Sequence, residues 1–148
     1  MDDPRVAMQA ALKVAMQEKD ALRRDVIRMS LNAIKQVEVD ERRSLSAEEA
    51  VAILQKEVKK RRESIDEARK AGRDDIVQSE LEQLAVLEIF LPKQMDRSEV
   101  EALARQAIAE TGAVNAKDTG KVMAVLMPQV RGLADGKLVN DVVRSLLN

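Results

Sequence analysis

Apolar residues recur every three or four positions along most of the chain, which is the spacing of one helical face. The stretch from residue 20 to residue 42 shows this clearly, with Leu22, Val26, Ile27, Leu31, Ile34 and Val37. The same spacing recurs in four segments before residue 95 and in three shorter segments after it. The pattern predicts an all-α protein, with an N-terminal bundle of about four helices followed by a small three-helix C-terminal domain.

Residues that favour helix ends delimit the first four segments. Helix starts are indicated by Asp3 before Pro4, by Asp20, by the pair Ser46 and Glu49, and by Asp74. Ser46 with Glu49 is a capping box, in which each side chain binds the backbone N–H of the other residue. Gly72 and Pro92 favour helix ends. We therefore predict helices that end near residues 19, 42, 71 and 90.

The C-terminal segments carry their own start and end signals. These are the capping box of Ser98 with Glu101, the helix end at Thr111-Gly112, Asn115 before a sixth helix that runs toward Pro128, and Asp135 before a seventh from about Gly136 to Leu147. Capping signals restart within the segment PKQMDRS, residues 92–98. We therefore expect an N-terminal domain over residues 1–95 and a C-terminal domain over residues 96–148.

The residue types that are missing restrict the chemistry. The 148 residues include no His, Cys, Trp or Tyr, and Phe90 is the single aromatic residue. The usual general base, the thiol nucleophile and the best metal ligands are therefore absent. Composition favours a binding or accessory protein over an enzyme, and we predict no catalytic residue, no metal site and no cofactor.

Charge and hydropathy limit which partners and which cellular compartment we expect. Lys and Arg number 25 and Asp and Glu number 26, a balance that excludes a grossly basic nucleic-acid binder but not a local basic face. The absence of cysteine fits a reducing compartment. The start of the chain lacks the apolar core of a signal peptide, and the longest apolar run, Val122 to Met127, is too short to cross a membrane. We expect a cytoplasmic protein without membrane contact.

The strongest basic run consists of Lys59, Lys60, Arg61 and Arg62. Four consecutive helical residues point in different directions, and carboxylates stand four residues away, at Glu57, Glu63 and Asp66. One interpretation is a solvated helix held by ion pairs along its length. The alternative is a secondary basic patch that contacts phosphates.

The segment DTGKVMAVLMPQVRGLADGKLVN, residues 118–140, holds three of the five glycines. It is not a nucleotide-binding phosphate loop, because Asn115 stands where the first glycine should be and Val122 where a hydroxyl residue should be. Its glycines and cations can form an anion site or can mark turns between short helices, and composition leaves both interpretations open. The candidate site residues are Lys117, Lys121, Arg131, Gly132, Gly136 and Lys137.

This segment resembles the hallmark segment of the GatB/YqeY family. Three earlier stretches resemble that family in the same order: LQKEVKKRRESI at residues 54–65, KAGRDDI at residues 70–76 and LEIFLPKQM at residues 87–95. The resemblance covers essentially the whole chain, as in free-standing YqeY-like proteins. It implies two helical domains, of which the second is similar to the tail domain of the B subunit of the glutamine-dependent Asp/Glu-tRNA amidotransferase.

In that enzyme the tail domain helps to hold the tRNA, while amide transfer takes place elsewhere. The resemblance therefore implies a tRNA-contacting surface around Lys121, Arg131, Gly132, Asp135, Gly136 and Lys137. It implies no transferase site, because the domain that holds that site has no counterpart in 148 residues. One position departs from the family pattern: Leu133 follows Gly132 where arginine is frequent, which removes one cation from the surface.

Three hypotheses of different classes follow. The first is a tRNA-binding accessory protein linked to tRNA-dependent amidation or translation, with tRNA as one partner and a protein of the translation or tRNA-amidation machinery as another. The second is a helical protein–protein adaptor. The third is an amidotransferase-related carbon–nitrogen ligase with glutamine as amide donor, which the missing residue types disfavour. Binding that weakens steeply with salt would favour RNA over the adaptor.

Overall fold

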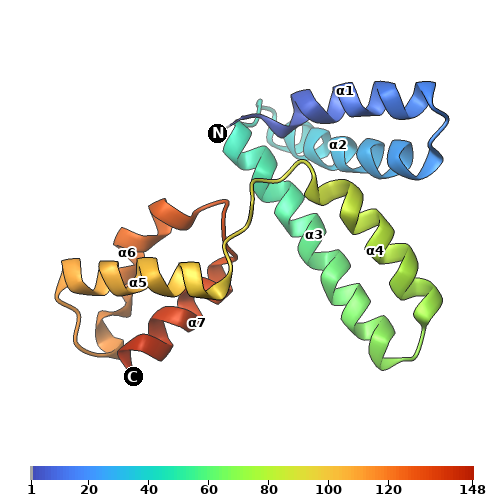
Figure 1. The fold of residues 1–148 in the computed structure, drawn as a ribbon. Helices are drawn as coiled ribbons and strands as arrows, with labels where there is room; N and C mark the ends of the chain where they lie inside the picture. The colour runs from blue at the N-terminus through green and yellow to red at the C-terminus, as the bar shows by residue number, and fades with distance from the viewer. Residues whose placement is uncertain (1) are drawn as a thin grey trace. The chain divides into compact units, whose positions relative to one another are not determined.

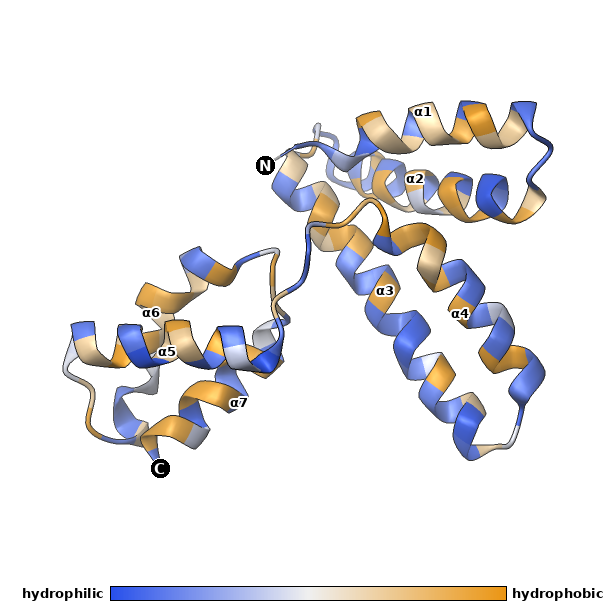
Figure 2. Ribbon diagram, viewed as in Figure 1, coloured by the Kyte–Doolittle hydropathy of each residue, from blue (hydrophilic) through white to orange (hydrophobic). Residues whose placement is uncertain are grey.

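A computed structural model describes residues 2–148, which form seven α-helices, one short 3-10 helix and no strand within that range (Figure 1). This confirms the predicted all-α fold. Hydrophobic residues recur between hydrophilic ones along the helices, as the predicted spacing of three or four residues requires (Figure 2). Within the described range, no helix combines the length and the apolar character needed to span a bilayer.

The chain divides into two compact units, Met1–Leu91 and Pro92–Asn148, each with its own hydrophobic core. The division lies four residues before the expected boundary at residue 95. The reason is that Gln94 and Met95 hydrogen-bond within the C-terminal unit. The Gln94 side-chain amide donates to the Gly132 carbonyl oxygen at 3.1 Å, and the Met95 N–H donates to the Leu133 carbonyl oxygen at 2.7 Å.

Two helical hairpins build the N-terminal unit. In the first, α1 (Pro4–Gln17) packs along α2 (Ala21–Glu41); in the second, α3 (Ala47–Lys70) packs along α4 (Asp74–Glu88). The hairpins contact each other mainly through α2. Their shared core includes the fully buried side chains of Met8, Ile27, Ile34, Leu54 and Leu87. Of the apolar face predicted for residues 20–42, Val26, Ile27 and Ile34 are buried, whereas Leu22 is 40% exposed. Leu31 and Val37 are partly buried against the same core.

Three predicted helix starts in this unit are confirmed. The Asp3 carboxylate accepts the Arg5 N–H at 3.0 Å, and the Asp20 carboxylate accepts the Arg23 N–H at 3.1 Å. Ser46 and Glu49 form the predicted reciprocal capping box, with bonds of 3.2 and 2.8 Å. Each carboxylate or hydroxyl satisfies a donor that the first helical turn leaves without a partner.

The predicted start of α4 is wrong by one position. Asp74 is the first helical residue rather than the cap, and Arg73 occupies the cap position without a side-chain capping bond. Asp74 and Asp75 both lie in the first turn, where the helix dipole favours negative charge. Gly72 follows α3 with a left-handed φ of +68°, as its predicted position after that helix requires.

Three helices that pack pairwise build the C-terminal unit: α5 (Arg97–Thr111), α6 (Thr119–Val130) and α7 (Gly136–Leu147). A short 3-10 helix, η1 (Ala116–Asp118), precedes α6. The core includes the fully buried side chains of Val100, Val122, Leu126, Val139 and Val142. The seventh predicted helix has the bounds that the sequence indicated.

The start of α5 differs from the prediction. The capping box is formed by Asp96 and Glu99, not by Ser98 and Glu101: the Asp96 carboxylate accepts the Glu99 N–H at 2.9 Å, and the Glu99 carboxylate accepts the Asp96 N–H at 3.0 Å. Aspartate caps as well as serine does, so the helix begins at the earlier of two competent pairs. The Ser98 hydroxyl instead donates to Asp96 at 2.8 Å.

The bounds of α6 also differ from the prediction. Asn115 caps η1 rather than α6, because its side-chain oxygen accepts the Lys117 N–H at 2.9 Å. At the other end, α6 continues past Pro128 to Val130. Proline lacks only its own N–H, and the Arg131 N–H still donates to the Met127 carbonyl oxygen at 2.9 Å. A proline so near the helix end therefore leaves the last turn intact.

Candidate nucleic-acid interface

The connection between α6 and α7, residues 131–137, makes a tight corner that we call the α6–α7 corner. Gly132 has a φ of +80°, a left-handed conformation that a residue with a side chain adopts only with strain. The N–H groups of Leu133 and Ala134 both donate to the Val130 carbonyl oxygen, at 2.8 and 3.0 Å. The geometry of the turn alone is therefore sufficient reason for a glycine at position 132, independently of any ligand.

The segment that precedes α5 is docked onto this corner. The Gln94 side-chain amide donates both to the Gly132 carbonyl oxygen, at 3.1 Å, and to the Pro92 carbonyl oxygen, at 2.9 Å. These bonds bring the backbone of the exposed Lys93 to the corner. Sequence reasoning missed Lys93, because residues 92–98 had no signal beyond that of a break between domains.

Local hydrogen bonds keep the Asp96 carboxyl of this segment ionised. The pKa of the Asp96 carboxyl lies below its usual value, chiefly because the carboxylate accepts the Glu99 N–H and the Ser98 hydroxyl, and also because Lys93 is nearby. Asp96 is therefore fixed as the anionic cap of α5.

The first turn of α7 presents backbone donors at the corner. Asp135 occupies the cap position but makes no side-chain capping hydrogen bond to this turn. Gly136 is the first helical residue, and a Cβ added there would meet no atom within 4 Å. Because its φ is not left-handed and the space around it is open, the packing of the chain does not require glycine at this position.

Two cations flank these donors. Arg131 and Lys137 are both exposed, and neither makes an ion pair with any residue that the structure describes. Lys137 lies in the first turn of α7, where the helix dipole adds positive potential. The corner therefore joins two available cations, a helix N-terminus and an open glycine.

Lys117 and Lys121 lie at the other end of α6. Lys121 lies ten residues before Arg131, which at a rise of about 1.5 Å per residue places it about 15 Å along α6 from the corner. Lys117 precedes α6, in η1. Lys121 lies 3.9 Å from the Asp118 carboxylate. The pKa of Asp118 is lowered chiefly by a hydrogen bond from the Val114 N–H, with a smaller contribution from Lys121. The structure thus groups four of the six candidates at the corner and separates the other two.

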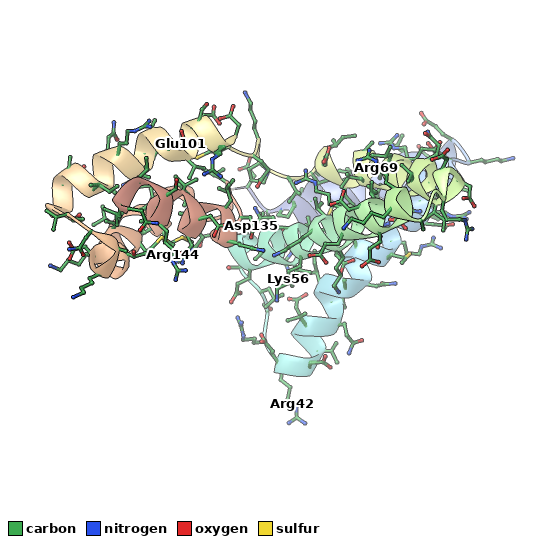
Figure 3. All side chains as sticks on the ribbon, turned by 90° about the horizontal axis from the view of Figure 1, so that it is seen from below. Arg42, Lys56, Arg69, Glu101, Asp135 and Arg144 are labelled. Carbon is green, nitrogen blue, oxygen red and sulfur yellow. The ribbon has the colours of Figure 1, made fainter. Side chains whose placement is uncertain are left out.

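Charge is unevenly distributed within the C-terminal unit. From residue 112 onward the chain has five basic and three acidic residues, whereas α5 has two basic and three acidic residues. Both basic residues of α5 pair with Glu101, Arg97 at 3.1 Å and Arg105 at 4.0 Å. Figure 3 labels Glu101 on α5, and Asp135 and Arg144 at the two ends of α7. Apart from Lys93, the available positive charge of this unit therefore belongs to η1, α6, α7 and the connection between α6 and α7.

The basic run on α3 has a largely structural role. Arg61, whose side chain is 11% exposed, donates to Gln83 at 2.5 Å and pairs with Glu80 at 3.5 Å, both on α4. Arg62 pairs with Glu88 of α4 at 2.9 Å. The expected pairing of these arginines along α3 is replaced by pairing across the hairpin, because α4 lies alongside. Of the predicted secondary patch, the exposed lysines Lys59 and Lys60 are not part of this bridge.

The chain is similar to known proteins over both of its units. A family model described as Yqey-like protein matches residues 5–147. Altered inheritance of mitochondria protein 41, mitochondrial, from Eremothecium gossypii, is 40% identical to the chain over 81 residues. That stretch is 54% of this chain and 44% of the relative, so the chain spans less than half of that relative's length.

Proposed function

The chain belongs to the YqeY-like protein family, and we propose that it is an accessory protein that binds tRNA through the α6–α7 corner. One observation carries the proposal. The N-terminus of α7 has no side-chain cap, and two cations without an ion pair, Arg131 and Lys137, lie beside it. A helix N-terminus attracts phosphate through its free N–H groups and its dipole. Arg131 adds a guanidinium that can bind phosphate in bidentate fashion, and Lys137 adds a point charge.

Gly136 has a specific place in this proposal. A phosphate oxygen can reach the N–H groups of the first turn only if no side chain covers them. The absence of any atom within 4 Å of a Cβ at this position leaves that approach open. The position is therefore suited to close contact with a ligand.

Recognition would depend on the backbone of a folded RNA. The C-terminal unit has no Phe, Tyr or Trp on which an unpaired base could stack. Contacts to phosphates and to the shape of the molecule remain, and a structured RNA offers both. The resemblance to the amidotransferase tail domain, which helps to hold tRNA, identifies tRNA as the RNA to test and links the protein to amidation or translation.

Surface apolar residues favour one competing function. Val6 and Val14 of α1 are 70% and 41% exposed, and residues eight apart lie near the same face of a helix. An adaptor that docks a partner helix on this face is therefore the second candidate. Its binding would respond weakly to salt, unlike binding to phosphates.

The test is a titration of unfractionated tRNA at several salt concentrations. The double variant Arg131→Ala and Lys137→Ala should flatten the slope of log affinity against log salt by about 1.5, because each phosphate contact contributes roughly 0.7–0.9. The matched double variant Lys117→Ala and Lys121→Ala removes the same charge at the other end of α6 and should flatten it less. Equal slopes for wild type and the corner variant, with helicity unchanged, would exclude the corner.

A further inference from the structure

A line of three cations runs along the exposed side of α2. Arg28, Lys35 and Arg42 are spaced seven residues apart, and all three are exposed. Seven residues correspond to nearly two helical turns and a rise of about 10 Å, so the three Cα atoms lie along one edge over about 21 Å. We call these residues the α2 cationic line.

The carboxylates nearest to this line have other partners. The Asp25 carboxylate accepts the Arg24 guanidinium at 2.8 Å. The Glu38 carboxylate lies 3.4 Å from Arg5 of α1 and accepts the Leu45 N–H at 3.1 Å. None of the three cations makes an ion pair with a residue in the described part of the chain. Arg24 chiefly, and Arg28 to a smaller extent, lower the pKa of the Asp25 carboxyl, so the charge of Arg28 is partly balanced. Lys35 and Arg42 have no such partner among the described ion pairs.

Two contacts place the line at the edge where α2 meets α1. Arg28 reaches the Met16 sulfur of α1 at 3.8 Å, and Glu38, between Lys35 and Arg42 in sequence, reaches Arg5 of α1. Arg42 ends α2 in a left-handed conformation with a φ of +55°, and its side chain projects beyond the helix end (Figure 3). The line therefore continues to the C-terminal end of α2, where the chain leaves toward α3.

Exposed cations on α3 provide a contrast within the same unit. Lys56, Arg69 and Lys70 are also exposed, but α3 intersperses carboxylates between them, at Glu57, Glu63, Asp66 and Glu67. Figure 3 labels Lys56 and Arg69 on this helix. Beside the α2 cationic line the outer positions are the neutral Asn32 and Val39. The two helices differ little in net charge, since α2 has four basic and four acidic residues and α3 has seven and six. The difference is that these two neutral residues lie between the cations of the α2 cationic line.

We propose that the α2 cationic line is a second binding surface for the phosphate backbone of RNA, a proposal whose ligand class rests on the proposed function. A nucleic-acid strand presents one negative charge about every 3.4 Å, so a straight row of cations can neutralise several phosphates of one strand. A membrane surface fits less well, because an interfacial helix inserts its apolar face. In α2 that face, with Val26, Ile27 and Ile34, is buried in the core.

The experiment compares two triple variants of the full chain in the same tRNA titration. Arg28→Gln, Lys35→Gln and Arg42→Gln should flatten the salt slope by about two to three units, because three phosphate contacts are lost. The control, Lys56→Gln, Arg69→Gln and Lys70→Gln, changes the net charge equally and should flatten it by less than one unit. Circular dichroism checks that both variants keep their helicity.

The outcomes separate this proposal from the function of the corner. Flattening by the α2 variant with no effect of the corner variant would support the line and refute the corner; the reverse would overturn only the line. Equal slopes for the two triple variants would also overturn the line. If wild type binds no tRNA but binds phosphatidylserine vesicles, and the α2 variant loses that binding, the line contacts a lipid surface and both RNA proposals fail.

Discussion

Three arginines of the N-terminal unit bridge helices by ion pairs, whereas the cations of the C-terminal unit either pair locally or have no ion-pair partner. Arg5 reaches Glu38 of α2, and Arg61 and Arg62 reach Glu80 and Glu88 of α4. In the C-terminal unit, the ion pairs of Arg97, Arg105 and Lys121 all involve a carboxylate three or four residues away.

This difference indicates what each set of cations does. A guanidinium that joins two helices is held by the fold and contributes to its stability. Arg131 and Lys137 contribute no such bridge, so their charge is available to a ligand. The comparison therefore predicts that removing a bridging cation lowers stability, whereas removing a cation without an ion pair, at the corner or on the α2 cationic line, lowers RNA affinity.

The largest expected effect on stability is at Arg61. Arg61→Met keeps much of the aliphatic packing but removes the bonds to Glu80 and Gln83. Because hydrogen bonds to charged groups contribute about 1.5–3 kcal/mol, we expect α3 and α4 to lose about that much protection from amide hydrogen exchange. Arg131→Met, the control in the other unit, should leave exchange unchanged. A similar loss in both variants would contradict the comparison.

A smaller effect, with opposite signs for stability and binding, is expected at Gly136. A Cβ fits there without contact, and alanine favours the helix, so Gly136→Ala should stabilise α7 by up to about 1 kcal/mol. The added methyl should nevertheless weaken tRNA binding, because it covers the backbone donors. Gly120→Ala, in equally open space near the start of α6, should stabilise without weakening binding. Unchanged affinity in Gly136→Ala would argue against phosphate contact at the α7 N-terminus.

The smallest effect is a pH dependence at the start of α3. Hydrogen bonds from Arg43 and from the Ser46 N–H lower the pKa of Glu49 from 4.5 to about 2. A lowered pKa in the folded state means that Glu49 stabilises the fold above about pH 4.5, and that this contribution is lost as the pH falls toward 2. Amide exchange at Ser46 and in the first turn of α3 should rise over that range. Glu49→Gln should remove this part of the dependence; an unchanged profile would mean that another group titrates.

Most helices could be predicted because amphipathic spacing and caps are local properties of the sequence. The two bounds of α7 and the caps at Asp3, Asp20 and Ser46 illustrate this. The start of α5 was missed because the sequence contains two overlapping capping pairs, and local rules do not decide between Asp96 and Ser98.

The candidate site could be predicted only in part. Arg131, Gly136 and Lys137 are close in sequence, so a short connection necessarily brings them together. Lys93 comes to the corner through Gln94, a contact over 38 residues that no local pattern indicates. Likewise, the pairing of Arg61 depends on where α4 lies, and intrahelical spacing rules contain no such information.

The most direct test of the central claim is an amide NMR titration of the full chain with unfractionated tRNA. If a phosphate is held at the α7 N-terminus, the largest shift changes should include the N–H groups of Gly136, Lys137 and Leu138, together with the side-chain Nε–H of Arg131. Changes confined to residues 116–121, or to α1 without any at the corner, would contradict the claim.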